Sequence, residues 1–314
     1  MNNGQPETER SALWITGAGG FTGRHLVAVL HDGPDRPRLV GLDHVPTRLS
    51  GLDACLPLDV TRVDDVAAAA RQEPPKWVIH LAGALPPAGE AEMWHVQVNG
   101  TVALLRGLAE AGCRDARVVS VGSAAEYLPG AVPPLTETSP CGGSSPYGRC
   151  KWAQTLAALG VGRELGTEIM VVRPFNLLGP GQSANLVAGR LCRLLADVAA
   201  DGEITAGNTR SARDFLDVRD AAAACWLVAR HGKAGAVYNV CTGRATTIDH
   251  LIALLCELTG KSPRILTDPA HLRDADVDVS FGDHTRLSEA TGWQPRIPLR
   301  DSLAAMLEAV GQAR

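Results

Sequence analysis

A tyrosine and a lysine four residues apart are the first side chains in this sequence whose spacing suits acid–base chemistry. They are Tyr147 and Lys151, at the start of a predicted helix over 147–165. The spacing places both on one helical face, where a lysine ammonium lowers the pKa of a phenol by favouring the phenolate. Such a tyrosine can give or take a proton at a carbonyl or alcohol oxygen. Ser123 follows the predicted strand Val118–Val121, and its hydroxyl could hold the same substrate oxygen.

Three glycines near the N-terminus form a second candidate site. Gly17, Gly20 and Gly23 make a G-x-x-G-x-x-G pattern between a predicted strand, Leu13–Thr16, and a predicted helix, Gly23–Leu30. In such a loop the first glycine permits a tight turn, the second lets the backbone approach a pyrophosphate, and the third lets the helix pack closely on the strand. The helix N-terminus offers free N–H groups to the phosphates. A structural turn is the alternative, but the position between strand and helix favours a dinucleotide site.

An acid after the next predicted strand indicates which dinucleotide is bound. Asp43 comes directly after the predicted strand Arg38–Leu42. A carboxylate there can accept hydrogen bonds from the adenosine ribose and would repel a 2′-phosphate. We therefore predict NAD as the cofactor, and NADP stays possible because Arg48 lies nearby. The alternative is that Asp43 only starts a turn.

Further residues complete the predicted cofactor site. Asp59 and Val60 could meet the adenine edge. Leu81, Ala82 and Gly83 could pass beneath the cofactor. Both segments could equally be turns at strand ends. The other predicted members are Phe21, Asn99, Pro174, Tyr147 and Lys151, the lysine through the nicotinamide ribose.

Short apolar runs alternate with segments of helical length through the first half of the chain. This order predicts βαβ units and an α/β fold, a Rossmann-type doubly wound parallel sheet with a smaller, discontinuous C-terminal lobe. The predicted main domain covers 11–175 and about 214–243, the lobe covers 176–213 and 244–314, and 1–10 is a flexible tail. The other predicted elements are the strands Trp77–Leu81, Arg117–Val121, Glu168–Arg173 and Val237–Val240 and the helices Val63–Arg71, Val96–Ala111 and Val187–Ala199.

Composition excludes several classes of protein. The 314 residues carry a formal net charge of −4 and no basic block, so no nucleic-acid partner is expected. The longest apolar run, Ala221–Ala229, is too short to span a bilayer, and no membrane association is expected. Met1–Arg10 is polar and lacks a signal-peptide core, which predicts a cytoplasmic location. The nine histidines lack metal-ligand spacing, and no metal site is predicted.

Together these residues resemble the extended short-chain dehydrogenase/reductase family, the group of NAD-dependent epimerases and dehydratases. The resemblance runs from about Leu13 to Leu307. Further segments that carry it are Arg173–Asn176, Gly179–Gln182, Arg213–Asp220 and Tyr238–Gly243. The most specific segments are similar to the C-terminal part of GDP-4-keto-6-deoxymannose reductases, and they are Leu272–Val277, Gly282–Asp283 and Thr291–Pro295.

The resemblance implies a nucleotide-sugar substrate, bound largely in the C-terminal lobe, and a homodimer formed through two helices of the main domain. By the same resemblance, Asn176 would hold the sugar diphosphate. Arg213 and Arg273 would face phosphate, for which guanidinium groups are well shaped. The alternative for both arginines is a solubilising place on the surface.

One departure from the family narrows the reaction. Its sugar-nucleotide dehydratases place an acid pair, or a glutamate, just after the strand-end hydroxyl, where this chain has Ala124 and Ala125. A 4,6-dehydration needs a base and an acid, and alanine supplies neither. Glu126 lies one step further, and on an extended segment it would point elsewhere. Dehydration is therefore disfavoured.

The leading prediction is an NAD(P)H-dependent 4-keto reductase of an NDP-4-keto-6-deoxyhexose. In it Tyr147 protonates the forming alkoxide, Lys151 poises the tyrosine, and Ser123 orients the carbonyl. The first alternative is a nucleotide-sugar 4-epimerase with tightly bound NAD, which would use the same three residues. The second is a non-catalytic Rossmann protein that senses NAD(H). Such proteins commonly lose the tyrosine or the lysine, and both are present here.

Overall fold

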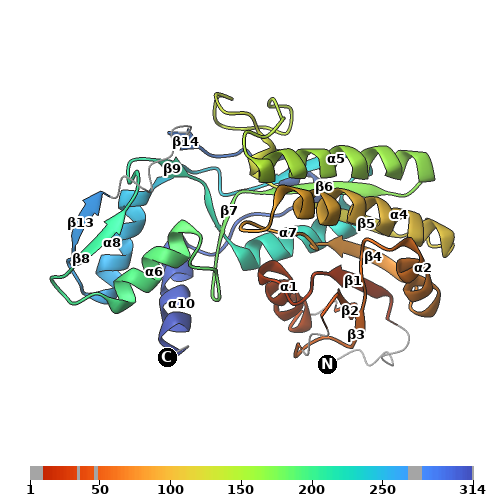
Figure 1. The fold of residues 1–314 in the computed structure, drawn as a ribbon, viewed down its shortest axis with the longest axis horizontal. Coiled ribbons are helices and arrows are strands. Elements are labelled where there is room, and N and C mark those ends of the chain that lie inside the picture. The colour runs from red at the N-terminus through yellow and green to blue at the C-terminus, as the bar shows by residue number, and fades with distance from the viewer. Residues whose placement is uncertain (1–9, 34–35, 46–48, 268–277, 313–314) are drawn as a thin grey trace.

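A parallel sheet of seven strands forms the centre of the computed structural model, which describes residues 10–33, 36–45, 49–267 and 278–312 (Figure 1). Its strand order is β11-β6-β5-β4-β1-β2-β3, and every neighbouring pair runs parallel. Strand order therefore reverses between β1 and β4, the point where doubly wound sheets bind ligands at the carboxyl ends of their strands. The predicted Rossmann-type sheet is confirmed. The strands are β1 (Ala12–Thr16), β2 (Arg38–Asp43), β3 (Ala54–Pro57), β4 (Pro75–His80), β5 (Arg117–Val121), β6 (Ile169–Pro174) and β11 (Val237–Val240).

Helices cover both faces of this sheet because its strands are apolar on both sides. In β1, Leu13 and Ile15 pack into one core, and Trp14 packs into the other. The first core is closed by α1 (Phe21–His31) and α7 (Val218–His231). The helices that close the second are α2 (Val63–Gln72), α4 (Gly100–Glu110) and α5 (Pro146–Leu165). Burial on both faces explains why these strands read as continuous apolar runs.

Two short irregular turns lie at the carboxyl end of the sheet and differ from the sequence-based expectation. The predicted helix Val96–Ala111 is preceded by α3 (Glu90–Trp94), and its first turn is a π-helix, His95–Asn99. Such π turns are frequent at functional sites. After β5, Ala124–Glu126 form one turn of 3₁₀ helix, so the extended segment predicted there is wrong.

A third core lies beside the sheet, at the left of Figure 1. It is built from a parallel strand pair and three helices, with Leu191, Leu251 and Leu303 at its centre. The predicted helix Val187–Ala199 is confirmed apart from its last two residues. The elements are α6 (Val187–Asp197), β8 (Glu203–Ala206), α8 (Ile248–Thr259), β13 (Arg264–Thr267) and α10 (Leu299–Gln312). This separate core supports the proposed C-terminal lobe, although α9 (Thr285–Thr291) packs on α7 instead.

Short strands connect the sheet to this third core. Between two of them lies Asp214, a fully buried carboxylate that accepts hydrogen bonds from the Thr242 N–H (2.8 Å), the Thr242 hydroxyl (2.7 Å) and the Gly243 N–H (2.9 Å). Asp214 thus ties together the segments that cross between the two parts. The strands are β7 (Asn176–Leu178), β10 (Phe215–Asp217), β9 (Ala212–Arg213), β12 (Thr246–Thr247) and β14 (Val279–Ser280). In the part of the chain that the structure describes, no helix combines the length and apolarity needed to cross a membrane.

Candidate active site

The glycine loop between β1 and α1 is a close-packed cradle for phosphate. Gly17 has a φ of +68°, and a Cβ there would come within 3.0 Å of the Ala82 backbone. At Gly23 a Cβ would lie only 2.5 Å from the Gly17 carbonyl oxygen, so α1 approaches the strand as closely as predicted. The helix begins at Phe21 after Gly20, and no side chain caps its first N–H groups. Those groups and the helix dipole fit the pyrophosphate of a dinucleotide.

Asp43 lies beside this loop at the end of β2. One carboxylate oxygen accepts a hydrogen bond from the Gly19 N–H at 3.1 Å, and the other lies 3.1 Å from His44 Nδ1. The acid is therefore held at the mouth of the cradle, where the ribose of a bound cofactor would meet it. Arg48 lies outside the described residues.

Of the other segments predicted to bind the cofactor, Asp59–Val60 forms a turn, whereas Leu81–Gly83 contacts Thr16 and Lys151. The Asp59 carboxylate accepts from the N–H (2.9 Å) and the hydroxyl (2.7 Å) of Thr61, which lower its pKa, while the neighbouring Val60 is buried. Leu81 and Ala82 instead donate their N–H groups to the Thr16 hydroxyl. A Cβ on Gly83 would lie 3.8 Å from Lys151 Nζ, so this segment joins the glycine loop to the candidate catalytic lysine. Pro174 is buried and ends β6, and Asn99 is exposed and ends the π turn.

The predicted catalytic group is brought together at the end of β5. Lys151 Nζ lies 6.0 Å from the centre of the Tyr147 ring. Burial raises the pKa of Tyr147 to about 12 and Glu126 adds to this, while a hydrogen bond with Ser123 opposes it. The pKa of Tyr147 is therefore raised rather than lowered as expected, because burial dominates and the lysine ammonium is directed at other partners. The phenol is protonated at neutral pH and can act as an acid.

Those other partners of Lys151 are oxygen acceptors. Its ammonium donates to the Val121 carbonyl at 2.8 Å and to Gln154 Oε1 at 2.9 Å. Burial lowers the pKa of Lys151 to about 8, with Glu126 and Cys150 acting in the opposite direction. The lysine is thus a buried cation close to the point at which it would lose its proton.

A buried ion pair behind Ser123 was missed by the sequence analysis. Glu126 accepts from the Ser123 N–H at 2.9 Å, from Arg173 Nε at 2.8 Å and from the Thr155 hydroxyl at 3.0 Å. Both charged side chains are almost fully buried. Glu126 is therefore directed at Arg173 through a 3₁₀ turn and a salt bridge, rather than along an extended strand. The sequence gives no local signal of this pairing, because Glu126 and Arg173 are 47 residues apart. Glu126 is a single acid in its segment, and Arg173 lies near the end of an apolar strand.

A buried histidine was also missed. His80 ends β4, and its two ring nitrogens lie 2.8 Å from the Thr16 hydroxyl and 3.0 Å from the Thr101 hydroxyl. Burial, aided by the charge of Lys151, lowers its pKa to about 3. The one available signal was a polar residue in the otherwise apolar run Val78–Leu81.

This histidine should make the fold sensitive to mild acid. An unfolded chain binds a proton at histidine below about pH 6.5, whereas folded His80 stays neutral to about 3, so protonation favours unfolding. Between pH 7 and pH 5 this group alone should remove about 2 kcal/mol from the free energy of unfolding. Urea unfolding of wild type and His80→Gln at both pH values measures the difference. The exposed His250→Gln serves as control, and parallel pH curves for wild type and His80→Gln would contradict the prediction.

Two of the predicted substrate residues, Asn176 and Arg213, lie on the short strands that connect the sheet to the third core. Asn176 is exposed on β7, and its side-chain amide donates to the Asp214 carbonyl at 3.0 Å. Arg213 is half-buried, and its guanidinium donates to the Ala212 carbonyl at 3.0 Å. Arg273 falls outside the described residues. The roles of all three in substrate binding stay predictions.

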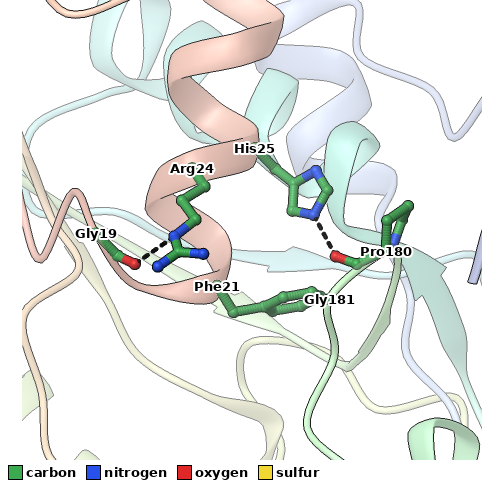
Figure 2. A pocket seen from close by; sticks show the side chains of 6 residues that line it. All are labelled: Gly19, Phe21, Arg24, His25, Pro180 and Gly181. Carbon is green, nitrogen blue, oxygen red and sulfur yellow. Dashed lines mark hydrogen bonds between the residues drawn. The ribbon is translucent and has the colours of Figure 1, made fainter. Parts of the chain in front are cut away.

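A cavity of about 240 Å³ separates the glycine loop from the loop after β7 (Figure 2). Phe21 extends toward Gly181, and Arg24 donates to the Gly19 carbonyl at 2.7 Å. His25 Nε2 lies 2.9 Å from the Pro180 carbonyl oxygen, which fastens the two loops together. The segment Gly179–Gln182, which helps to carry the family resemblance, therefore docks beside the glycine loop.

Comparison with known proteins agrees with this geometry. Residues 13–241 match the NAD dependent epimerase/dehydratase family. The chain belongs to this family. The matched range contains the glycine cradle and the whole group of Ser123, Tyr147 and Lys151.

Relatives in this family resemble the chain over nearly its full length. It is 34% identical to the GDP-6-deoxy-D-mannose reductase of Pseudomonas aeruginosa, over 94% of this chain and 95% of that protein. It is 29% identical to the dTDP-6-deoxy-L-talose 4-dehydrogenase (NAD(P)(+)) of Kitasatospora kifunensis, over 98% of each. The solved structure of RMD from Pseudomonas aeruginosa complexed with NADPH has a TM-score of 0.84 at 31% identity, covering 97% of this chain and 99% of that one.

The chain is therefore an NAD(P)-dependent enzyme of the extended short-chain dehydrogenase family, as the resemblance implied. Its own residues fit that cofactor. The cradle leaves no room for side chains at Gly17 and Gly23, and the uncapped start of α1 offers N–H groups to phosphate.

Proposed function

We propose that the chain is an NAD(P)H-dependent 4-keto reductase of an NDP-4-keto-6-deoxyhexose, with GDP-4-keto-6-deoxymannose as the model substrate. The observation that carries this is Tyr147 within hydrogen-bonding reach of Ser123 and on one helix with Lys151, with alanines at positions 124 and 125 where a dehydratase would need acids. Two relatives support a nucleotide sugar as the substrate, because one is a GDP-6-deoxy-D-mannose reductase and the other is a dTDP-6-deoxy-L-talose 4-dehydrogenase.

In the proposed mechanism, the reduced nicotinamide supplies a hydride to C4 when it is bound. The chain's own residues handle the oxygen of that carbonyl. The Ser123 oxygen accepts from the Ala125 N–H at 3.1 Å, and its own hydrogen is shared with Tyr147, so it can be donated to the carbonyl when a substrate is bound. Tyr147 then gives its proton to the oxygen at C4. Lys151, charged below a pH of about 8, stabilises the phenolate that remains.

The diphosphate of the substrate is proposed to lie near β7 and β9. Asn176 and Arg213 stand on these strands, and Arg273 follows β13 in the chain. Guanidinium groups favour phosphate oxygens through paired, charged hydrogen bonds.

A 4-epimerase is the second candidate, supported by 27% identity over 94% of the chain to a UDP-glucose 4-epimerase of Mycolicibacterium smegmatis. It would use the same Ser123, Tyr147 and Lys151, with the hydride leaving C4 and returning to its other face. The two reactions differ in the fate of the cofactor, which stays bound through an epimerase cycle and exchanges in a reductase cycle.

The deciding experiment mixes purified protein with GDP-4-keto-6-deoxymannose and NADH, and separately NADPH, and follows the absorbance of the reduced nicotinamide. Consumption with either cofactor supports the reductase. Without consumption, the protein is denatured and its released nucleotide is measured. Stoichiometric NAD on the purified protein, together with interconversion of an NDP-hexose at C4, would replace the reductase proposal by the epimerase.

Asp43 should set the preference between the two cofactors. In Asp43→Asn the acceptor for the Gly19 N–H is kept and the negative charge is removed. The ratio of kcat/KM for NADPH to that for NADH should rise roughly tenfold, because repulsion of the 2′-phosphate is lost. Asp64→Asn, an exposed acid at the start of α2, is the matched control. An unchanged ratio in Asp43→Asn would remove this acid from the ribose site.

A homodimer and a cytoplasmic location stay proposals. The first comes from the family resemblance. Size-exclusion chromatography with light scattering measures the oligomeric state directly.

A further inference from the structure

A continuous chain of hydrogen bonds leads from the cofactor cradle to the catalytic lysine. Thr16 Oγ1 lies 2.8 Å from His80 Nδ1, and His80 Nε2 lies 3.0 Å from Thr101 Oγ1. Gln154 Nε2 donates to Thr101 Oγ1 at 3.1 Å, and Lys151 Nζ donates to Gln154 Oε1 at 2.9 Å. All five side chains are buried. They come from β1, β4, α4 and α5, so only the packed sheet and helices assemble them.

The orientation of the Gln154 amide is determined from the lysine end. A charged ammonium can only donate hydrogen bonds. The side-chain oxygen of Gln154 must therefore face Lys151, and its NH₂ group must face Thr101.

The same orientation follows independently from the other end. The single hydroxyl hydrogen of Thr101 goes to the Gln97 carbonyl at 2.5 Å, so Thr101 Oγ1 can only accept from Gln154 and His80. His80 must then carry its proton on Nε2. Its Nδ1 accepts from the Thr16 hydroxyl, whose oxygen takes the N–H groups of the two residues that follow β4.

We infer that Gln154 is a positioning residue for Lys151, with an amide locked by Thr101 and His80 so that it presents only an acceptor to the ammonium. A buried cation is disfavoured by desolvation and is retained where acceptors face it. Within the described structure this ammonium donates hydrogen bonds to Gln154 Oε1 and to the Val121 carbonyl. Removing the first takes away half of its hydrogen-bonded support. The lock therefore holds Lys151 charged, in the state that the proposed function requires.

The other groups around Lys151 do not replace this lock. Glu126 and Cys150 favour the charged lysine, but Glu126 already bonds Arg173, Thr155 and the Ser123 backbone. On the side of β4, His80 is neutral and is held in the chain of hydrogen bonds. On α5, the Tyr147 ring lies 6.0 Å away.

The test is a direct titration of Lys151 by NMR in protein labelled with ¹³C at lysine Cε. The chain has only four lysines, Lys76, Lys151, Lys233 and Lys261, so the signals can be assigned by substitution. In Gln154→Met the acid dissociation constant of Lys151 should rise roughly tenfold, because an acceptor for the charged form is lost. In Gln154→Glu it should fall by a similar factor, because a carboxylate replaces the amide oxygen.

Opposite changes in the acid dissociation constant of Lys151 in the two variants support the inference. General loosening of the core would instead change this constant in the same direction in both variants. An unchanged dissociation constant in Gln154→Met, or shifts of the same sign, would overturn it. Ser302→Ala, which removes a buried hydrogen bond to Asp217 in the C-terminal part, is the control and should leave Lys151 unaffected.

A measurement on the wild type covers the case in which neither variant folds. Long-range ¹H–¹⁵N spectra of His80 should show a neutral ring with its proton on Nε2 from pH 5 to pH 9. A proton on Nδ1, or a charged ring in this range, would overturn the inference because the amide would no longer be locked. The inference rests on the role of Lys151 in the proposed function. Both NMR experiments need neither sugar nor turnover, so their failure is distinguishable from failure of the 4-keto reductase assay.

Discussion

Tyr147→Phe should lower kcat by about two to four orders of magnitude, the usual effect of removing a positioned general acid. Phenylalanine keeps the ring and removes only the hydroxyl that gives its proton to the oxygen at C4. Burial holds the pKa of this hydroxyl at about 12, so at neutral pH the proton is present to be given. Affinity for NADH should stay within a few-fold of wild type, because the glycine cradle is unchanged. Steady-state kinetics and a fluorescence titration with NADH measure the two effects.

Tyr238→Phe is the matched control for this change. The Tyr238 ring is buried, and its hydroxyl accepts a hydrogen bond from the Lys233 N–H at 2.9 Å. Loss of that bond should cost about 1 kcal/mol of stability and leave turnover intact. Full activity in Tyr147→Phe would refute the mechanism. Wild-type protein that binds NADH but turns over no nucleotide sugar would instead favour the non-catalytic, NAD(H)-sensing alternative.

Arg173→Met should reduce the free energy of unfolding by about 3–5 kcal/mol, because it leaves the Glu126 carboxylate buried without its partner. The pair is joined at 2.8 Å, with the arginine 2% and the glutamate 0% exposed, so water cannot replace the lost charge. Arg173 also donates to the Tyr127 hydroxyl at 3.3 Å, which adds to the loss. Urea unfolding at pH 7, followed by circular dichroism, measures this change.

Arg300→Met is the control for the ion pair. Arg300 and Glu257 are joined at the same distance, 2.8 Å, but are 51% and 63% exposed. Loss of this exposed pair in Arg300→Met should reduce the free energy of unfolding by no more than about 1 kcal/mol, since solvent screens exposed charges. The double variant Glu126→Gln/Arg173→Met should recover part of the stability lost in Arg173→Met, because no unpaired charge remains. Equal losses in Arg173→Met and Arg300→Met would mean that burial does not strengthen the pair.

Much of the fold and part of the site could be predicted because their signals are local. The strand Arg117–Val121 was predicted with its observed bounds, since a strand buried on both faces is a short apolar run. The glycine loop was recognisable from its spacing together with its place between a predicted strand and a predicted helix, because positions 17 and 23 exclude side chains for steric reasons within a few residues of chain. The helical spacing of Tyr147 and Lys151 likewise needs no tertiary information.

Other features could not be predicted, because they depend on which distant residues share a buried environment. The sequence by itself determined the parallel α/β order, and it predicted the glycine loop and the candidate Ser, Tyr and Lys group. Only the tertiary structure decided that Glu126 turns inward to Arg173, that Gln154 rather than Tyr147 receives the Lys151 ammonium, and that burial raises the pKa of the tyrosine. The physical reason is that desolvation and hydrogen-bond partners set the charge state of a buried group. Both are properties of the packed interior. In the hydrogen-bond chain that ends at Lys151, for example, Thr16 and Gln154 are 138 residues apart in the sequence.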